Sequence, residues 1–253
     1  MISEKLKISL PLRPSENRIL LATSENRQKL AIYQPYFPEI LLYSSENLDQ
    51  PPQILKLGDS PPKISKIHFY DQNTLSYLTQ RGQFFTYDIR QSGHMPANVF
   101  QTSENSKADI IYTFDSIPSK HFVGIVDSCG GYEKFDVRNT KISLARQILQ
   151  EFEDVKSILG SQFNLLYGQE SLAGENYFVL SGMKQTCVPV FCDQNFSDQG
   201  QVVSIFRHQG HTKTVTNAFW HPTVPRLVFS TSIDSMLHAW QFNAEENPEI
   251  CEK

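Results

Sequence analysis

Residue types that hydrolytic enzymes use occur together near the C-terminus. His211 is followed by Ser230 and Ser232, then by Asp234 and Trp240. A histidine, a serine and an aspartate in hydrogen-bond contact can form a catalytic triad, in which the histidine activates the serine hydroxyl. The chain has no Gly-x-Ser-x-Gly elbow, the strained turn that exposes the serine nucleophile of α/β-hydrolases. The pattern therefore favours a structural hydrogen-bond relay, and no catalytic residue is predicted.

In the expected relay, Asp234 lies in a hairpin turn and orients His211. A serine hydroxyl joins them, and the indole N–H of Trp240 completes the chain. Such a network satisfies every donor and acceptor away from water. The sequence leaves open whether Ser230 or Ser232 takes part.

Other residues that could bind a metal are His208, His211 and His221, which lie close together in the chain. Imidazole is a common ligand for zinc and copper. However, His211 belongs to a Gly-His pair and His221 to a His-Pro turn, so structural roles already account for two of them. Cys187 and Cys192 have opposite strand parity, so their side chains would face opposite sides of a regular strand. No metal site is predicted, and the absence of nucleotide-binding motifs predicts no cofactor.

Two short motifs could bind a partner protein. Tyr87-Asp88-Ile89-Arg90 and Phe135-Asp136-Val137-Arg138 each place an aspartate two residues before an arginine. They resemble the WDxR box of cullin-4 ubiquitin ligase receptors, in which the arginine contacts the DDB adaptor. Arg90 and Arg138 are therefore candidate partner-binding residues. The alternative is that each arginine pairs with its own aspartate.

The elements that position these residues form a repeat, and its last copy is the clearest. It runs from Gly210-His211 through Phe219-Trp220-His221-Pro222 to a strand that ends at Trp240, 29 residues after His211. This order is that of a WD40 repeat, the unit of a β-propeller blade. Gln241 replaces the usual aspartate after the tryptophan.

Similar strand–turn–strand hairpins precede it along the chain. The hairpins are Leu20–Gln34, Leu75–Arg90, Phe122–Arg138, Phe178–Asp193 and Leu227–Gln241. Each of the last four hairpins has an aspartate or glutamine at or near its end. These residues, Asp88, Asp136, Asp193 and Gln241, are 48, 57 and 48 positions apart. This is the spacing of propeller blades with loop insertions. The sequence thus predicts an all-β WD40 β-propeller, with about five recognisable blades in one domain spanning residues 1–253.

Several segments complete this prediction. Residues 1–10, with alternating Lys5–Leu10, could supply a closing strand, and residues 243–253 form an acidic tail. Glu39–Leu57 could be a fragment of a sixth blade. Leu144 to Leu159 has helical periodicity, but a four-stranded blade needs a strand at Ile142–Leu149, and we favour the strand.

The polar segments between the expected strands are the candidates to bind partners. Ser44–Pro62, Gln91–Lys107 and Asp193–Gln201 are expected to be mainly exposed loops, the first with one short strand. Loops on a rigid scaffold often carry specificity.

Composition narrows the class of protein. The 253 residues are 40% hydrophobic and 20% charged, with a formal net charge of −4 and no basic run. This argues against direct nucleic-acid binding. No apolar stretch is long enough to span a membrane, and four irregularly spaced cysteines do not form a disulfide scaffold. A cytoplasmic or nuclear protein is expected.

The last repeat also resembles the WD repeat-containing protein 73 family. The similar segments are Arg207–His211, Val215–Pro222 and Leu237–Trp240, with weaker likeness at Leu75–Gln91 and Leu10–Arg13. The family has seven blades, for which 253 residues are few. Either the chain is a short form, or it contains weak blades that the repeat pattern does not reveal, or its ring is completed irregularly.

The resemblance implies a non-catalytic, monomeric scaffold for protein–protein interactions. The partners it implies are Integrator endonuclease subunits and their HEAT-repeat chaperone, and also tubulin or other spindle components. It further implies a cytoplasmic location, with a fraction at the mitotic spindle pole and in the nucleus. The alternative function is a substrate receptor of a cullin-4 ubiquitin ligase, and a propeller enzyme is a third hypothesis.

Overall fold

The computed structural model describes residues 19–35, 37–46, 50–58, 62–91, 98–102, 110–117, 119, 121–149, 163–168, 176–182, 185–193 and 201–243. Within these ranges the chain forms β-strands joined by turns and loops, without an α-helix. The all-β prediction is therefore confirmed for this part of the chain. Among the same residues, no helix has the length and apolar character needed to cross a lipid bilayer.

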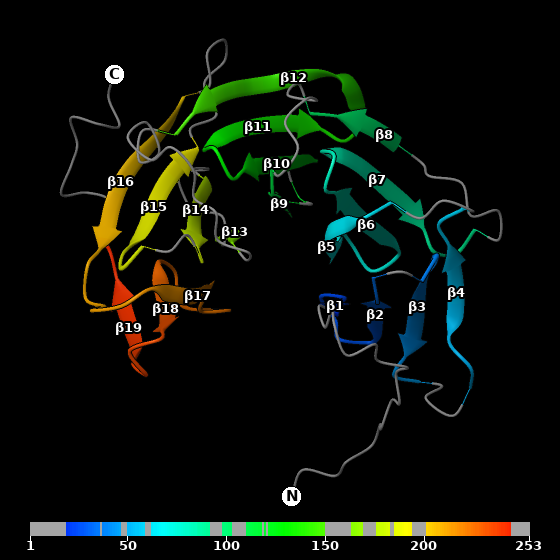
Figure 1. The fold of residues 1–253 in the computed structure, drawn as a ribbon, viewed down its shortest axis with the longest axis horizontal. Coiled ribbons are helices and arrows are strands. Elements are labelled where there is room, and N and C mark those ends of the chain that lie inside the picture. The colour runs from blue at the N-terminus through cyan, green and yellow to red at the C-terminus, as the bar shows by residue number, and fades with distance from the viewer. Residues whose placement is uncertain are drawn as a thin grey trace, which may run out of the picture. The chain divides into compact units, whose positions relative to one another are not determined.

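The contacts within the chain divide it into two compact units. Unit 1 comprises Met1–Gln101 and unit 2 comprises Thr102–Lys253. Each unit holds its own sheets, and every sheet is an antiparallel meander in which strands pair in chain order (Figure 1).

Unit 1 contains two four-stranded sheets. Sheet A consists of β1 (Leu20–Thr23), β2 (Lys29–Tyr33), β3 (Glu39–Ser44) and β4 (Gln53–Lys56). Sheet B consists of β5 (Ile64–Phe69), β6 (Thr74–Thr79), β7 (Gln83–Asp88) and β8 (Asn98–Gln101). The first strands of the two sheets, β1 and β5, pack against each other.

Unit 2 contains three sheets. Sheet C consists of β9 (Tyr112–Ile117), β10 (Phe122–Asp127), β11 (Gly131–Asp136) and β12 (Asn139–Ile148). Sheet D consists of β13 (Asn164–Tyr167), β14 (Asn176–Ser181), β15 (Val188–Asp193) and β16 (Val202–His208). Sheet E consists of β17 (Val215–Trp220), β18 (Leu227–Ser232) and β19 (Leu237–Gln241), so it has three strands among the described residues. The first strands of these sheets also contact each other, β9 with β13 and β13 with β17.

Tight turns close the hairpins where the sequence supplies glycine. Gly82 joins β6 to β7 with φ of +72°, and Gly130 joins β10 to β11 with φ of +86°. Glycine adopts this left-handed region without steric cost, because it has no Cβ.

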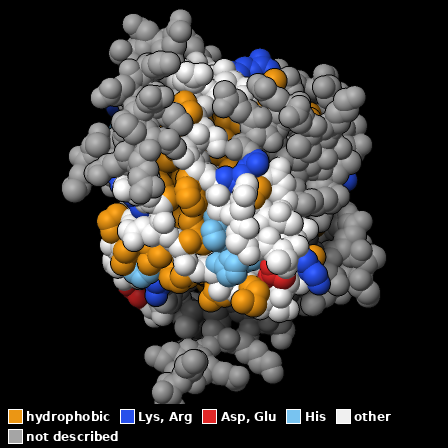
Figure 2. Space-filling view, turned by 90° about the vertical axis from the view of Figure 1, so that its left-hand side faces the viewer, with side chains coloured by type: hydrophobic (Ala, Val, Ile, Leu, Met, Phe, Trp, Pro, Cys, Tyr) orange, Lys and Arg blue, Asp and Glu red, His pale blue; other side chains and the backbone are white. Residues whose placement is uncertain are grey.

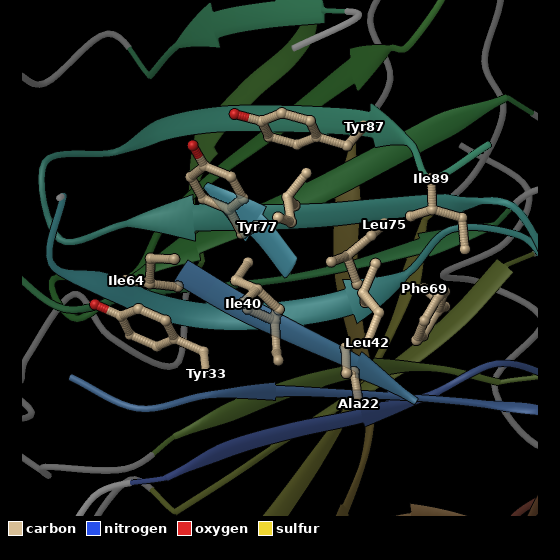
Figure 3. Close-up of a cluster of buried hydrophobic side chains, with 13 residues drawn as sticks. Ala22, Tyr33, Ile40, Leu42, Ile64, Phe69, Leu75, Tyr77, Tyr87 and Ile89 are labelled. Atoms are coloured by element: carbon tan, nitrogen blue, oxygen red, sulfur yellow. The ribbon is translucent and has the colours of Figure 1, made fainter. Parts of the chain in front are cut away.

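The core of unit 1 lies between its two sheets. Tyr33, Ile40 and Leu42 of sheet A face Leu75 and Tyr77 of sheet B in one buried cluster (Figure 3). Their spacing of two residues along each strand follows from the alternation of side chains between the faces of a sheet. The hydrophobic period of the sequence therefore determines which face of each sheet is buried.

Sheet D shows why some strands contain a continuous apolar run. Along β14, Phe178 and Leu180 pack in the cluster shared with sheet C, whereas Tyr177 and Val179 pack in the cluster shared with sheet E. All six residues of β14 are buried. A strand covered on both faces needs a continuous hydrophobic run rather than an alternating one.

Two expectations about segments change, and a third is confirmed. Glu39–Leu57 is not part of a sixth repeat, because β3 and β4 complete sheet A. Gln91–Lys107 is not wholly a loop, because β8 pairs with β7 and Phe100 is buried against Phe84. The strand favoured at Ile142–Leu149 is confirmed by β12, whose pairing with β11 satisfies its backbone groups in a ladder and rules out a helix there.

Other expectations fall on residues outside the described ranges. These are the closing strand at residues 1–10, the acidic tail at residues 244–253, the segment 150–162 and most of Asp193–Gln201. The sequence predictions for these segments stand as predictions.

Candidate functional site

The residues predicted to form a relay lie together in sheet E. The indole Nε1–H of Trp240 donates to Ser230 Oγ at 3.0 Å. Ser230 Oγ lies 2.8 Å from His211 Nε2, and His211 Nδ1 lies 3.3 Å from Asp234 Oδ2. We refer to these four residues as the histidine relay.

The strand register explains why these side chains meet. Ser230 of β18 pairs with His238 of β19, and Val228 pairs with Trp240. Residues opposite each other share a face, so Ser230 and Trp240 point to the same side. That side packs on sheet D, and the loop from β16 to β17 delivers His211 to it.

One hydrogen arrangement satisfies every group of the relay. Trp240 donates to Ser230, the Ser230 hydroxyl donates to His211 Nε2, and His211 Nδ1–H donates to Asp234. In this arrangement the imidazole is neutral and carries its proton on Nδ1. No polar atom of the relay then lacks a partner.

Asp234 also holds the surrounding turns. Its carboxylate accepts N–H groups from Thr212 and Met236, each at 3.0 Å. Burial acts to raise the pKa of this carboxyl, but these hydrogen bonds and that of His211 outweigh it, so the net pKa lies well below the usual value. Asp234 is therefore an anion at neutral pH.

The structure also decides between the two serines. Ser230 is the relay member, whereas the Ser232 hydroxyl donates to the carbonyl oxygen of Lys213 at 2.9 Å. Ser232 Oγ in turn accepts the N–H of Asp234 at 3.3 Å. Ser232 thus stabilises the β18–β19 turn that positions Asp234.

The order of groups in the relay is that of a catalytic triad, but its serine is inaccessible. Ser230 has 0% exposed surface and lies in the middle of a strand. Its oxygen already accepts the Trp240 indole N–H, and no substrate carbonyl can approach it. A nucleophile must be exposed on a turn such as the hydrolase elbow. The arrangement supports packing and not acyl transfer.

Two further histidines surround the relay. His208, the last residue of β16, stacks on Trp240 with ring centroids 4.7 Å apart. His238 of β19 stacks on His211 with centroids 4.0 Å apart and planes 8° from parallel. His208 Nε2 and His238 Nδ1 lie 3.0 Å apart.

Sequence reasoning grouped His208 and His211 with the wrong third histidine. His221 lies in the turn after β17, where its Nδ1 accepts N–H groups from Thr223 and Val224 at 3.1 and 2.9 Å. The missed residue is His238, which shares the strand parity of Trp240. Parity along Leu237–Gln241 was the signal that could have found it.

Burial affects the chemistry of His208. Removal from water, followed by the neighbouring His238 and His211, lowers its pKa from 6.5 to about 4. The ring is therefore neutral at pH 7 and retains a lone pair on one nitrogen.

Each Asp-x-Arg motif forms a local ion pair. Arg90 donates from Nε and Nη2 to the two carboxylate oxygens of Asp88, at 2.9 and 2.6 Å. Arg138 contacts Asp136 in the same way, at 3.0 and 2.7 Å. The arginine side chains remain 66% and 64% exposed. The local pairing weighed as the alternative is therefore present at both motifs.

A second buried polar network lies between sheets C and D, and no sequence pattern predicted it. Asp193 accepts a hydrogen bond from Tyr132 at 3.1 Å and an ion-pair contact from Lys134 Nζ at 2.9 Å. The hydroxyls of Tyr132 and Tyr167 lie 2.7 Å apart. We refer to these four residues as the tyrosine–aspartate cluster. Burial raises the pKa of both phenols well above the usual value, so both stay protonated.

The face of sheet E away from sheet D is apolar and open. Phe219 and Leu237 are 43% and 60% exposed, and Phe219 stacks on Phe229 at 5.3 Å. Ile233 and Met236, in the adjoining hairpin, are also exposed. We refer to these five residues as the apolar patch. Hydrophobic side chains gather beside histidines on the side of unit 2 that carries β16 and β19 (Figure 2).

Comparisons with known proteins add no family. No protein-family model matches the chain, and no curated protein matches it either.

Proposed function

We propose that this chain is a WD40-type β-propeller protein that binds other proteins and catalyses no reaction. The architecture is supported by meander sheets whose first strands pack on one another within each unit. Radial stacking of such sheets is how propellers bury sheet faces that a single blade cannot bury. The histidine relay, with the residue order of a WD40 repeat, supports the same assignment.

The apolar patch carries the functional proposal. The described residues include nine exposed large hydrophobic side chains, and five of these belong to sheet E or its loops. An exposed apolar area of this kind marks an interaction surface, because water contact with it is unfavourable. The occupant we propose is the surface of another protein with apolar anchor residues.

The test is affinity purification from cells with two matched variants. Phe219→Ser with Leu237→Ser removes apolar side chains from the patch. Leu144→Ser with Ile148→Ser removes two equally exposed apolar side chains from β12. We expect at least about a tenfold loss of the main partner for the first variant and none for the second. Equal recovery with both variants would overturn the proposal.

The resemblance to the WD repeat-containing protein 73 family supplies the partner to look for. We propose Integrator endonuclease subunits and their HEAT-repeat chaperone first, and tubulin or spindle components second. A monomer located mainly in the cytoplasm is part of the same proposal. Self-association through the patch, measured as a dimer by light scattering that Leu237→Ser abolishes, would contradict it.

The exposed guanidinium groups favour the second candidate, a cullin-4 ligase receptor. Asp88 and Asp136 hold Arg90 and Arg138 in fixed orientations, while two thirds of each arginine side chain contacts solvent. A double Arg90→Ala and Arg138→Ala variant should lose the ligase adaptor, and Arg81→Ala should keep it. Unchanged recovery of the adaptor, or no recovery with the wild type, would reject this candidate.

A further inference from the structure

The nitrogen atoms of two histidines face each other beside the histidine relay. His208 Nε2 and His238 Nδ1 are 3.0 Å apart in a hydrogen bond in which one ring nitrogen donates to the other, and their ring planes are 88° from parallel. Together with His211 they form the one group of metal-ligating side chains found among the described residues. Both rings are held by stacking, His208 on Trp240 and His238 on His211.

The separation of the two nitrogens suits a shared metal ion. Two imidazole nitrogens bound to tetrahedral zinc at about 2.0–2.1 Å lie roughly 3.3 Å apart. The rings of His208 and His238 would therefore open by only a few tenths of an ångström. Neutral imidazole nitrogens are suitable ligands for zinc, copper and nickel.

Ring orientation excludes His211 from the same ion. A metal lies close to the plane of the imidazole that binds it, since the nitrogen lone pair lies in that plane. The planes of His211 and His238 are nearly parallel, with centroids 4.0 Å apart, so one ion cannot lie in both. His211 also keeps both nitrogens in the relay.

Gly210 lies directly against both histidine rings. A Cβ at this position would lie 2.8 Å from His208 Nε2, from His208 Cε1 and from His238 Nδ1. Any other residue would thus place a carbon atom against both ligand atoms. Glycine therefore allows the two rings to lie this close to each other and to the backbone.

We propose that His208 Nε2 and His238 Nδ1 bind one divalent transition-metal ion, with zinc as the first choice. Zinc tolerates varied geometry because it has no preference from its d electrons. The remaining coordination positions are filled by water or by a side chain of a bound protein. With only two protein ligands, affinity in the micromolar range is expected.

The test is titration of the chelator-stripped protein with zinc chloride at pH 7.5, against a chromophoric zinc chelator. Cys129, Cys187 and Cys192 form no disulfide among the described residues and could compete for zinc, so Cys129→Ser, which removes the exposed thiol, is the background. We expect one zinc ion per chain. His208→Ala or His238→Ala should weaken binding more than about tenfold, since even outer-shell substitutions cost 10–100-fold.

Two further variants keep the proposal falsifiable if a histidine variant unfolds. Gly210→Ala retains both ligands but fills the space between them, so it should also weaken zinc binding more than about tenfold. His221→Ala removes a histidine of the same sheet and should bind zinc as the background does. Circular dichroism identifies any variant that fails to fold. The proposal is overturned if zinc does not saturate at one equivalent, or if the folded Gly210→Ala variant binds as tightly as the background.

Discussion

The interface between sheets C and D (the C–D interface) and sheet E each contain buried polar side chains, but the charges of these side chains differ. Both contain a buried polar network: the tyrosine–aspartate cluster lies between sheets C and D, and the histidine relay lies on the face of sheet E that packs on sheet D. The first network buries a full ion pair, with Lys134 and Asp193 at 8% and 1% side-chain exposure. The second has one anion, Asp234, that accepts two backbone N–H groups.

The two networks therefore depend on different interactions, an ion pair in the C–D interface and hydrogen bonds in sheet E. In the C–D interface, water cannot reach a charge that loses its partner, so removal of either ion is costly. In sheet E, the groups are held by hydrogen bonds, some of them to the Asp234 carboxylate, and by stacked rings, and the loss of one hydrogen bond costs less. The other face of sheet E exposes Phe219 and Leu237, whereas the facing sides of sheets C and D are covered by a shared core.

The largest expected effect is at Asp193. Asp193→Asn should lower the free energy of unfolding by about 3–5 kcal/mol, because it leaves the Lys134 charge buried without its counter-ion. Urea denaturation measures the change. The double variant Lys134→Met with Asp193→Asn should cost clearly less than the sum of the single variants. Simple additivity would show that the buried pair is not coupled.

The next effect tests how tightly the same interface is packed. A Cβ on Gly124 would lie 2.2 Å from the hydroxyl oxygen of Tyr167. Gly124→Ala should therefore destabilise the fold by about 2–3 kcal/mol through overpacking. Adding Tyr167→Phe removes the colliding oxygen and should recover part of the loss in thermal melting. No recovery would mean that the clash is relieved elsewhere.

A smaller loss is expected in the histidine relay. Ser230→Ala leaves the Trp240 indole N–H and His211 Nε2 without a partner, at a cost of about 1–2 kcal/mol. Ser232→Ala is the matched control on the same strand and should cost less, because Ser232 contributes only turn hydrogen bonds. Chemical denaturation of both variants makes the comparison. A larger loss for Ser232→Ala would contradict the assignment of Ser230 to the relay.

The smallest effect is at an exposed ion pair, the counterpart of the buried one. Hydrogen bonds from the Arg90 side chain and N–H lower the pKa of the Asp88 carboxyl from 3.8 to about 2. A lowered folded-state pKa contributes stability above the unfolded value, and this contribution is lost as pH falls from about 4 towards 2. Arg90→Ala should return the Asp88 midpoint towards 3.8 in an NMR titration, with little change in stability at pH 7. An unmoved midpoint would show that Arg90 is not the cause.

Much of the fold could be predicted, because hairpins and turns depend on residues that lie close together in the sequence. The alternation of polar and apolar residues predicts most hairpins, and the turn at Gly82 needs only a positive φ. β8 was missed because Asn98–Gln101 is short and lies in a polar segment, where only pairing with β7 stabilises it. Glu39–Leu57 was misassigned because a strand does not reveal from its own sequence which sheet it joins.

From residue types and spacing alone, the sequence predicted His211, Asp234 and Trp240 as members of the histidine relay. Only the tertiary structure chose Ser230 over Ser232, because that choice depends on which hydroxyl reaches the imidazole. It also brought His238 to His208 across sheets D and E. The tyrosine–aspartate cluster joins residues from β11, β13 and β15, up to 61 positions apart. Such contacts arise from the packing of separate sheets, and no local pattern of residues encodes them.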